Sequence, residues 1–325
     1  MPGMGSFLYL SRADVEAVGP AMAEMIACVE RVFQEMGNGR VEMPPKPGIH
    51  TRPNAFIHAM PASIPSLGAA GLKWVSGYPG NQKNGLPYIS GLLLLNDPET
   101  GLPLAVMDCT WITAKRTGAA TAIAAKYLAR KDSKSAGIIA CGVQGRSNLE
   151  ALTCLFPIQT VKAYDLHLEI AKQFAHEMGN KLHLEIEPVA KLACAVQQMD
   201  LVVSSGPILK DPKPAIEPGW LSAGGFASLV DFDSSWQADA IREVDKLATD
   251  DKAQMAYYRR DGYFRTTPTP YADLGEIAAG RKPGRESNNE RTMAINLGIG
   301  SEDVAAAMLV YRKAREMKIG VELPL

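Results

Sequence analysis

A glycine-containing turn in the middle of the chain has the residue types and spacing of a dinucleotide-binding site. The turn, at 141–146, follows an apolar segment at 136–140 that we predict to be a strand, and a helix is expected after it. At such a turn the backbone N–H groups and the helix N-terminus face a pyrophosphate. Gly142 allows close approach of the phosphates, and Gly145 allows the helix to pack closely on the strand. Ala140 occupies the position of the usual first glycine, so the fingerprint is incomplete.

An acidic residue follows this turn at the distance that ribose binding requires. Asp165 comes after the next predicted strand, at 160–164, and is followed by Leu166 and His167 rather than by an arginine. A carboxylate at this position accepts hydrogen bonds from the adenosine ribose and repels a 2′-phosphate. The pattern therefore predicts NAD as the cofactor in preference to NADP. Asp165 could equally be the N-cap of a helix, and the two roles are compatible.

Segments around the turn alternate between strand and helix patterns. We expect strands at 136–140, 160–164, 183–186, 201–204 and 227–230, and helices at 147–156, 168–178 and 190–198. Such alternation predicts right-handed crossovers and a parallel sheet. The expected fold class is α/β, with a Rossmann-type domain at 116–299.

The N-terminal region has a different pattern. Ser11 and Asp14 mark a helix start, and the segment 21–36 has helical spacing. Short apolar runs between Pro and Gly residues follow, and those at 89–95 and 102–107 flank a loop of turn formers, which predicts a hairpin. We expect an α+β domain with a mostly antiparallel sheet at 1–115. An alanine-rich helix at 111–130 leads out of it, and a C-terminal segment at 300–325, with a helix at 302–317, completes it.

Composition excludes several classes of function. The chain has 325 residues with 34 basic and 35 acidic side chains, a balance that does not favour a nucleic-acid partner. Its N-terminus does not resemble a signal peptide, and no apolar run is long enough for a membrane helix. Five separated cysteines indicate reduced thiols, and five histidines lack zinc spacing, so we expect a cytoplasmic protein without a metal.

Four segments of the sequence resemble the ornithine cyclodeaminase/mu-crystallin family: 71–75, 108–120, 142–150 and 296–303. The resemblance spans nearly the whole chain, and these segments occur in the order typical of the family. The resemblance implies a homodimer whose subunits each combine a substrate and dimerisation domain with a Rossmann domain, the active site lying in the cleft between them. The family includes amino-acid dehydrogenases, cyclic-imine (ketimine) reductases, cyclodeaminases and a lens crystallin.

The resemblance also implies roles for particular residues. Lys73 matches a lysine that contacts substrate and assists proton movement, and Arg116 matches an arginine that holds the α-carboxylate. Asp231 matches an aspartate near the substrate amino group. Cofactor contacts are implied for Thr117 and for the turn residues Gly142, Val143 and Gln144. We also expect Ser204 and Ser205, at the end of the strand at 201–204, to contact the cofactor.

Two departures from the family pattern affect the substrate site. A substrate arginine after paired prolines is Lys46 here, which keeps the charge but loses the bidentate geometry. The context of Asp231 lacks the Gly-Asp-x-Pro-Gly-Lys pattern of the cyclodeaminases, so either Asp231 or Asp233 is the candidate catalytic acid.

These residue types suit hydride transfer at the α-carbon of an amino acid. Arginine and lysine bind a carboxylate, a desolvated lysine can lose its proton near neutral pH, and an aspartate can orient the amine. Structural alternatives exist: Lys73 could extend to the surface, Arg116 could pair with a carboxylate, and His50 and His58 could be structural.

The sequence therefore predicts an NAD-dependent oxidoreductase acting on the CH–NH or CH–NH2 group of a small amino or imino acid. One alternative is an ornithine cyclodeaminase-type ammonia-lyase that uses NAD catalytically. The other is a non-catalytic, crystallin-like nucleotide-binding protein.

Overall fold

Two sheets of different kinds organise the chain, as the two sequence patterns predict. A computed structural model describes residues 5–53 and 55–325. The chain divides into a first unit, Met1–Arg116 with Gly298–Leu325, and a second unit, Thr117–Leu297. Helix α3 (Thr110–Leu128) contains the boundary between them.

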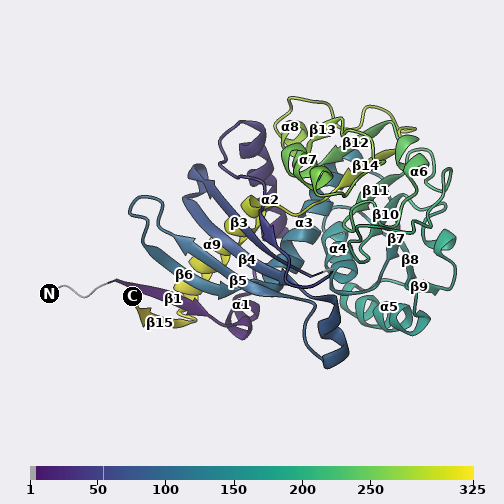
Figure 1. Ribbon diagram of the computed structural model, residues 1–325. Helices are drawn as coiled ribbons and strands as arrows, with labels where there is room; N and C mark the ends of the chain where they lie inside the picture. The colour runs from purple at the N-terminus through teal and green to yellow at the C-terminus, as the bar shows by residue number, and fades with distance from the viewer. Residues whose placement is uncertain (1–4, 54) are drawn as a thin grey trace. The chain divides into compact units, whose positions relative to one another are not determined.

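The second unit contains an eight-stranded sheet in the order β13-β12-β14-β11-β10-β7-β8-β9, in which every pair is parallel (Figure 1). The strands are β7 (Ser135–Ile139), β8 (Thr160–Tyr164), β9 (Ile186–Val189), β10 (Leu201–Ser204), β11 (Phe226–Leu229), β12 (Lys246–Thr249), β13 (Ala272–Asp273) and β14 (Thr292–Ile295). The predicted parallel sheet is confirmed. Because β7 pairs with β8 on one side and β10 on the other, the strand order reverses at β7, and ligands of such sheets bind at the carboxyl ends of the strands there.

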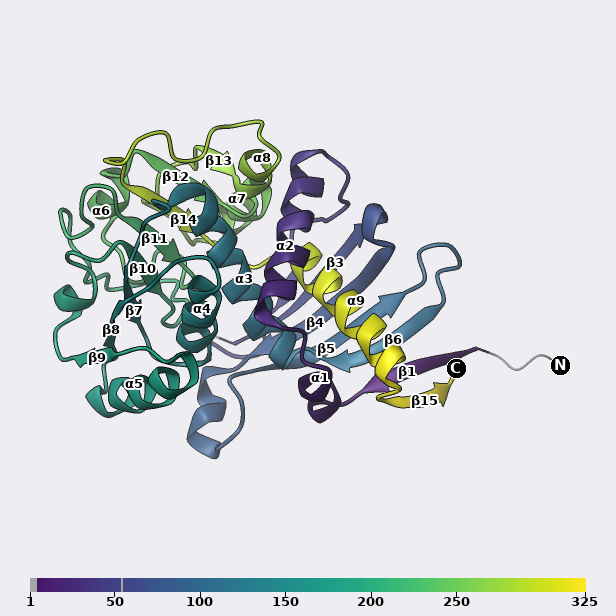
Figure 2. The same cartoon turned by 180° about the vertical axis from the view of Figure 1, so that it is seen from behind.

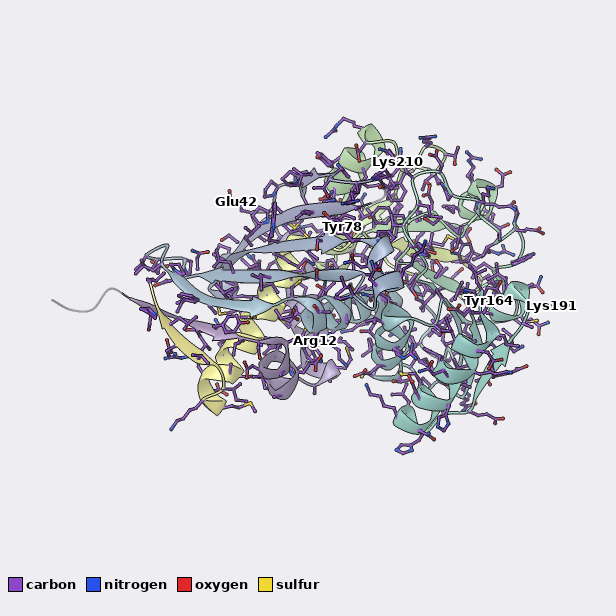
Figure 3. All side chains as sticks on the ribbon, turned by 60° about the horizontal axis from the view of Figure 1, so that its bottom comes forward. Arg12, Glu42, Tyr78, Tyr164, Lys191 and Lys210 are labelled. Carbon is purple, nitrogen blue, oxygen red and sulfur yellow. The ribbon has the colours of Figure 1, made fainter. Side chains whose placement is uncertain are left out.

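The helices of this unit follow the strands. They are α4 (Val143–Thr153), α5 (Leu168–Leu182), α6 (Ala238–Arg242), α7 (Lys252–Arg260) and α8 (Leu274–Ala278). Helix α4 begins four residues earlier than predicted, because Gly142 is its N-cap and the turn residues belong to its first turn. Figure 3 marks Tyr164, the last residue of β8 and the neighbour of Asp165.

Two predicted elements of this unit are wrong. The helix expected at 190–198 is only the short 3-10 turn η3 (Leu192–Ala195). A Cβ on Gly137 of β7 would lie 1.7 Å from the carbonyl oxygen of Ala195, so the chain passes too close to the strand to leave room for a full helix. The strand expected at 183–186 is displaced to 186–189, because α5 continues to Leu182 and ends with His183 in the left-handed conformation at φ 55°.

The first unit contains a seven-stranded sheet in the order β15-β1-β6-β5-β4-β3-β2, antiparallel except where β1 pairs with β6. The strands are β1 (Ser6–Leu10), β2 (Gly48–Ile49), β3 (Phe56–Ile64), β4 (Ala69–Gly77), β5 (Ile89–Asn96), β6 (Pro103–Asp108) and β15 (Val321–Pro324), and two 3-10 turns, η1 (Pro65–Leu67) and η2 (Pro79–Asn84), follow β3 and β4. The mostly antiparallel sheet and the β5–β6 hairpin are confirmed. The edge strand β15 and its neighbour β1 were not predicted.

Helices cover one face of this sheet. Helix α9 (Gly300–Met317) lies behind the strands in Figure 1 and in front of them in Figure 2, where α1 (Arg12–Val18) and α2 (Met22–Gly37) lie on the same side. The predicted start of α1 is confirmed: Ser11 and Asp14 form a reciprocal capping box. The apolar residues that α9 and the strands share form the core of the unit.

The opposite face of the sheet, which we call the outer face, is also apolar. Strand register places Trp74 of β4 opposite Leu92 of β5, and these side chains are 45% and 48% exposed. The next row across the sheet is formed by Pro61, Leu72, Leu94, Val106 and Tyr9. Side chains alternate between the two faces of a strand, so these residues point away from α9.

Candidate active site

A buried cluster of charges occupies the first unit where α9 begins. Lys73 is 1% exposed, and its Nζ lies 2.6 Å from Oδ2 of Asp303, which is fully buried. Arg116 donates from Nε to Oδ1 of Asp303 at 2.9 Å and from Nη1 to Oε2 of Glu302 at 3.0 Å. The two predicted cations are therefore brought together, and a single carboxylate contacts both.

The sequence around the cluster explains how these charges are packed. Lys73 follows the inward alternation of β4, and its Cα partners are Met60 of β3 and Leu93 of β5. Gly298 has φ 71°, and a Cβ there would lie 2.5 Å from Nη1 of Arg116, so glycine leaves the space that the guanidinium fills. A Cβ on Gly300 would lie 2.9 Å from the Met60 carbonyl oxygen, which shows how closely α9 approaches β3.

Two further basic side chains lie near this cluster. Lys46 is buried and donates from Nζ to the carbonyl oxygen of Gly298 at 2.8 Å. His58 stacks on Phe56 with ring centroids 4.2 Å apart and lies over Gly48, where a Cβ would meet the imidazole at 2.4 Å. Lys46 is thus placed with the predicted substrate cations, and His58 is held by ring packing.

Burial controls the protonation of this cluster. It lowers the pKa of Lys73, with the charge of Asp303 opposing the shift and the charge of Arg116 adding to it. Burial also lowers the pKa of His58 to about 3, and the nearby Lys46 charge contributes to this shift. His58 is therefore neutral near pH 7, whereas Lys73 has a lowered pKa and keeps the carboxylate of Asp303 beside it.

The turn after β7 has a geometry that depends on two glycines. A Cβ on Gly145 would lie 2.5 Å from the carbonyl oxygen of Ala140, so any side chain there would push α4 away from β7. A Cβ on Gly142 would meet nothing within 4 Å, which leaves open space beside the N-terminus of α4. Ala140 has φ 67°, a conformation that favours the glycine usually found at this position.

Asp165 and Arg146 fix this turn from outside. Asp165 accepts hydrogen bonds from the backbone N–H of Cys141 at 2.9 Å and of His167 at 3.1 Å. Arg146 donates from Nε and Nη2 to Oε2 of Glu177 at 3.0 and 2.6 Å, and it also contacts the carbonyl oxygen of Cys141. Its positive charge is thus balanced by Glu177, whose pKa is lowered by that hydrogen bond.

A buried acid lies at the carboxyl end of β11. Asp231 is fully buried and accepts hydrogen bonds from Ser204 Oγ at 2.6 Å and from Ser235 Oγ at 2.5 Å, while Trp236 Nε1 donates to Ser204 Oγ at 3.1 Å. Burial raises the pKa of Asp231. Asp233 instead accepts a hydrogen bond from Thr267 Oγ1 at 2.7 Å.

The structure places the remaining predicted cofactor residues as follows. Ser205 donates from Oγ to the carbonyl oxygen of Ala140 at 3.0 Å, so it contacts the turn itself, and Thr117 is buried on α3. Val143 is 64% exposed at the first position of α4. Sequence reasoning did not assign roles to Asp303, Glu302 or Ser235.

Comparison with known proteins decides the family. The model of the ornithine cyclodeaminase/mu-crystallin family matches residues 8–318. The chain belongs to this family. An alanine dehydrogenase of Archaeoglobus fulgidus is 35% identical over 328 residues, which cover 97% of this chain and 98% of that protein.

Solved structures of this family have the same fold. The pyrroline-2-carboxylate reductase of Thermococcus litoralis, in complex with NADH and L-proline, has a TM-score of 0.89 and 37% identity over 98% of this chain and 100% of that chain. An archaeal alanine dehydrogenase dimer with bound NAD has a TM-score of 0.88 and 34% identity over 99% of this chain and 100% of that chain.

The geometry of the second unit fits a dinucleotide. The open space at Gly142 lies at the carboxyl end of β7, where the strand order reverses and where the N-terminus of α4 favours negative charge. Asp165 stands at the end of the neighbouring strand, and the nearby Arg146 is already paired with Glu177. These residues suit an unphosphorylated ribose better than a 2′-phosphate.

The described part of the chain has neither a membrane-spanning helix nor a cluster of possible metal ligands. In residues 5–53 and 55–325 no helix has the length and apolar character needed to cross a membrane. Over the same ranges, no group of three His, Cys, Asp or Glu side chains is arranged to hold a metal ion.

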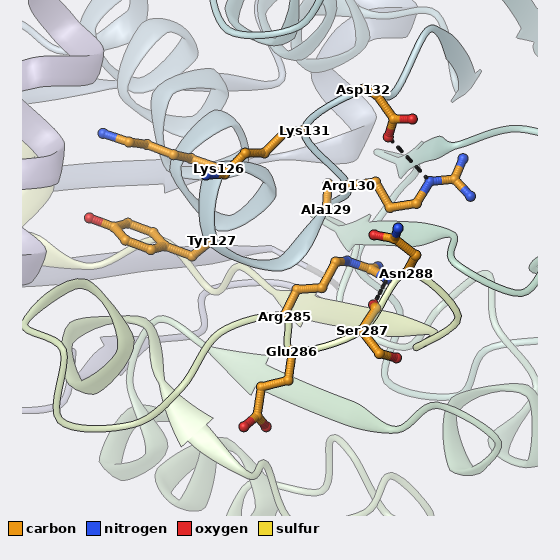
Figure 4. Close-up of a pocket in the computed structure, with 10 residues that line it drawn as sticks. All are labelled: Lys126, Tyr127, Ala129, Arg130, Lys131, Asp132, Arg285, Glu286, Ser287 and Asn288. Atoms are coloured by element: carbon orange, nitrogen blue, oxygen red, sulfur yellow. Dashed lines mark hydrogen bonds and ion pairs between the residues drawn. The ribbon is translucent and has the colours of Figure 1, made fainter.

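A pocket of about 480 Å³ in the second unit is lined by basic side chains that have structural contacts. Its lining, drawn in Figure 4, includes the basic residues Lys126, Arg130, Lys131 and Arg285. Arg285 donates to the carbonyl oxygens of Leu128 at 2.7 Å and Glu290 at 2.6 Å, and Arg130 contacts the carboxylate of Asp200. Arg285 thus links the segment before β14 to the end of α3, and Arg130 links the end of α3 to Asp200 before β10.

Proposed function

We infer that the chain is an NAD-dependent oxidoreductase that acts on the CH–NH or CH–NH2 group of a small amino or imino acid. One observation carries this inference: a buried pair of cations, Lys73 and Arg116, occurs in the same chain as a glycine turn at the switch point of a parallel sheet. The cations suit a carboxylate and the turn suits a dinucleotide.

The relatives support a small substrate. One is a reductase of pyrroline-2-carboxylate solved with L-proline, and others are alanine dehydrogenases. We propose that this chain likewise takes a short or cyclic α-imino or α-amino acid, in which the carboxylate is the main handle for binding.

We propose that Arg116 and Lys46 bind the substrate carboxylate, because both are buried cations on one cluster. Asp303 and Glu302 fix the plane of the Arg116 guanidinium, so it can be presented in one orientation. Lys46 is the more flexible partner and supplies a point charge.

The nicotinamide of NAD accepts or supplies the hydride, and the protein must manage one proton at the substrate nitrogen. Lys73 is proposed to hold or move that proton, since burial lowers its pKa toward neutrality. Asp231 is proposed as the acid near the amine in preference to Asp233, because Asp231 is buried with a raised pKa and Asp233 is engaged by Thr267.

For the cofactor we propose contacts with Thr117, the turn residues and Asp165. Ser205 contacts this turn, and Ser204 would act by holding Asp231.

We also propose that the protein is a homodimer formed through the outer face. The two rows of apolar side chains that include Trp74 and Leu92 would be costly to leave in water. A related alanine dehydrogenase is described as a dimer.

The cytoplasm remains our proposed compartment, since the five cysteines form no disulfide with one another.

The proposed function is tested by a panel of pyruvate with ammonia, pyrroline-2-carboxylate and ornithine, assayed for both NADH absorbance and ammonia. We expect steady NADH oxidation with a keto acid plus amine or with the cyclic imine. Ammonia release from ornithine with no net change in NADH would instead establish a cyclodeaminase. NADH binding without any turnover would indicate a crystallin-like protein.

A further inference from the structure

Two carboxylates at the start of α9 orient Arg116 but are not themselves proposed to bind substrate or to move a proton. Glu302 and Asp303 belong to the first turn of this helix and are both 0% exposed. The N-terminus of a helix favours negative charge, which lowers the cost of burying them. Even so, a buried ion pair is often no more stabilising than apolar residues of similar volume. The fold alone therefore does not require acids at these positions.

The two acids contact the cluster differently. Asp303 bridges the cations, with Oδ2 at 2.6 Å from Nζ of Lys73 and Oδ1 at 2.9 Å from Nε of Arg116. Glu302 contacts Nη1 of Arg116 at 3.0 Å. Asp303 is thus placed to fix both the position and the charge of Lys73.

The other groups that face Lys73 cannot replace that carboxylate. Arg116 and Thr113 approach from α3, and the Thr113 hydroxyl lies 3.5 Å from Nζ. Cys109 is near Lys73, but burial raises its pKa to about 11, so it is a neutral thiol near pH 7. On β3, His58 is neutral near pH 7.

Lys46 adds a third cation to this environment, because its charge helps to lower the pKa of His58, which also responds to the charge of Lys73. Without the charge of Asp303, Lys73 would lie beside the positive charge of Arg116, which lowers its pKa further. The ammonium form of Lys73 would then lose its main stabilising partner.

We propose that Asp303 is a positioning residue that holds Lys73 and Arg116 together and sets the pH range over which Lys73 carries its proton. This proposal rests on the proposed function for its catalytic meaning, but the ion pair itself can be measured without any substrate. Glu302 is the matched control, since it is adjacent, equally buried and in contact with Arg116.

The first test compares the pH profiles of kcat/KM for the wild type, Asp303→Asn, Asp303→Glu and Glu302→Gln. Asp303→Asn should move the limb that reports Lys73 to lower pH by about 1–3 units, the size expected when an adjacent opposite charge is removed. Asp303→Glu should restore that limb toward its wild-type position. Glu302→Gln should raise KM and leave the limb in place. Equal shifts in Asp303→Asn and Glu302→Gln, or no shift in either, would overturn the proposal.

The second test needs no turnover and stays informative if the proposed function fails. Urea midpoints are measured for Lys73→Met, Asp303→Asn and the double variant. Removing Asp303 alone leaves a buried ammonium without its carboxylate, so the double variant should be more stable, or give more soluble protein, than Asp303→Asn. If the losses of the two single variants simply add, Asp303 does not act on Lys73 and the proposal is wrong. If the effects of the two substitutions on stability are coupled but no substrate in the panel turns over, the ion pair is supported and the proposed reaction is wrong.

Discussion

Burial lowers the pKa of two neighbouring basic side chains in the first unit, and they differ in what surrounds them. Lys73 keeps a carboxylate within 2.6 Å, which offsets part of the cost of removing an ammonium from water. His58 is packed between Phe56 and Gly48 and responds by remaining neutral, with its pKa lowered to about 3. This difference separates a lysine held beside a carboxylate from a neutral histidine that is held by ring packing.

The pKa of His58 predicts how stability depends on pH. In the unfolded chain the histidine titrates near 6.5, whereas in the folded state it titrates near 3. The unfolded state therefore binds more protons between these values, and stability is lost as the pH falls through that window. We expect His58 to contribute up to about 1.4 kcal/mol per pH unit.

Urea unfolding of the wild type and His58→Gln at pH values from 7 to 4 measures this contribution. The free energy of unfolding of the wild type should fall more steeply than that of the variant over this range. Parallel curves would mean that His58 titrates normally in the folded protein.

The family resemblance selected Lys73 and Arg116 from the sequence, and their residue types supported that choice. A lysine inside an apolar strand and an arginine at the start of a small-residue helix are unusual, and both lie in one cluster. Asp303 could not be predicted as their partner, because it lies 187 residues after Arg116 and only the fold brings α9 to β4. The alternative that Arg116 pairs with a carboxylate is confirmed.

At the scale of elements, prediction succeeded where the pattern was regular. Strands β8 and β10 have their predicted bounds, and β7 and β11 differ by one residue at each end. Strands β12 and β14 were missed, as were β1 and β15 of the first unit. The helix predicted at 190–198 failed because its contact with Gly137 is tertiary information.

The element after β7 allows two glycines to be compared. Gly142→Ala adds a methyl group to open space, so it should change the free energy of unfolding by less than about 1 kcal/mol. The same methyl group would occupy the space proposed for the phosphates, and we expect NADH affinity to fall at least about tenfold, or about 1.4 kcal/mol.

Gly145→Ala is the matched variant for stability. Its methyl group would meet the Ala140 carbonyl oxygen at 2.5 Å, and we expect a loss of about 1–3 kcal/mol. Fluorescence titration with NADH and urea unfolding of both variants check this pair. Unchanged NADH affinity in Gly142→Ala would remove the phosphates from this turn.

At the scale of the whole molecule, the outer face predicts how subunits associate. Trp74→Asp would place an unpaired charge among apolar side chains, and we expect dimer affinity to fall by at least about 2 kcal/mol, the effect of a central interface residue. Light scattering after size-exclusion chromatography should give twice the chain mass for the wild type and the chain mass for the variant.

Leu166→Asp is the control, because Leu166 is an apolar residue of the second unit that is 85% exposed. This variant should remain a dimer. A wild-type monomer, or a Trp74→Asp variant that stays dimeric at micromolar concentration, would contradict the assignment of the outer face.

The central claim is that hydride moves between NADH and the α-carbon of a small imino or amino acid. It is tested most directly with NADH that carries deuterium at C4 of the nicotinamide, in both stereochemical forms, and pyrroline-2-carboxylate as the acceptor. We expect one of the two forms to yield proline with a single deuterium at the α-carbon. Proline without deuterium from either form, or no consumption of NADH with any substrate of the panel, would contradict the account.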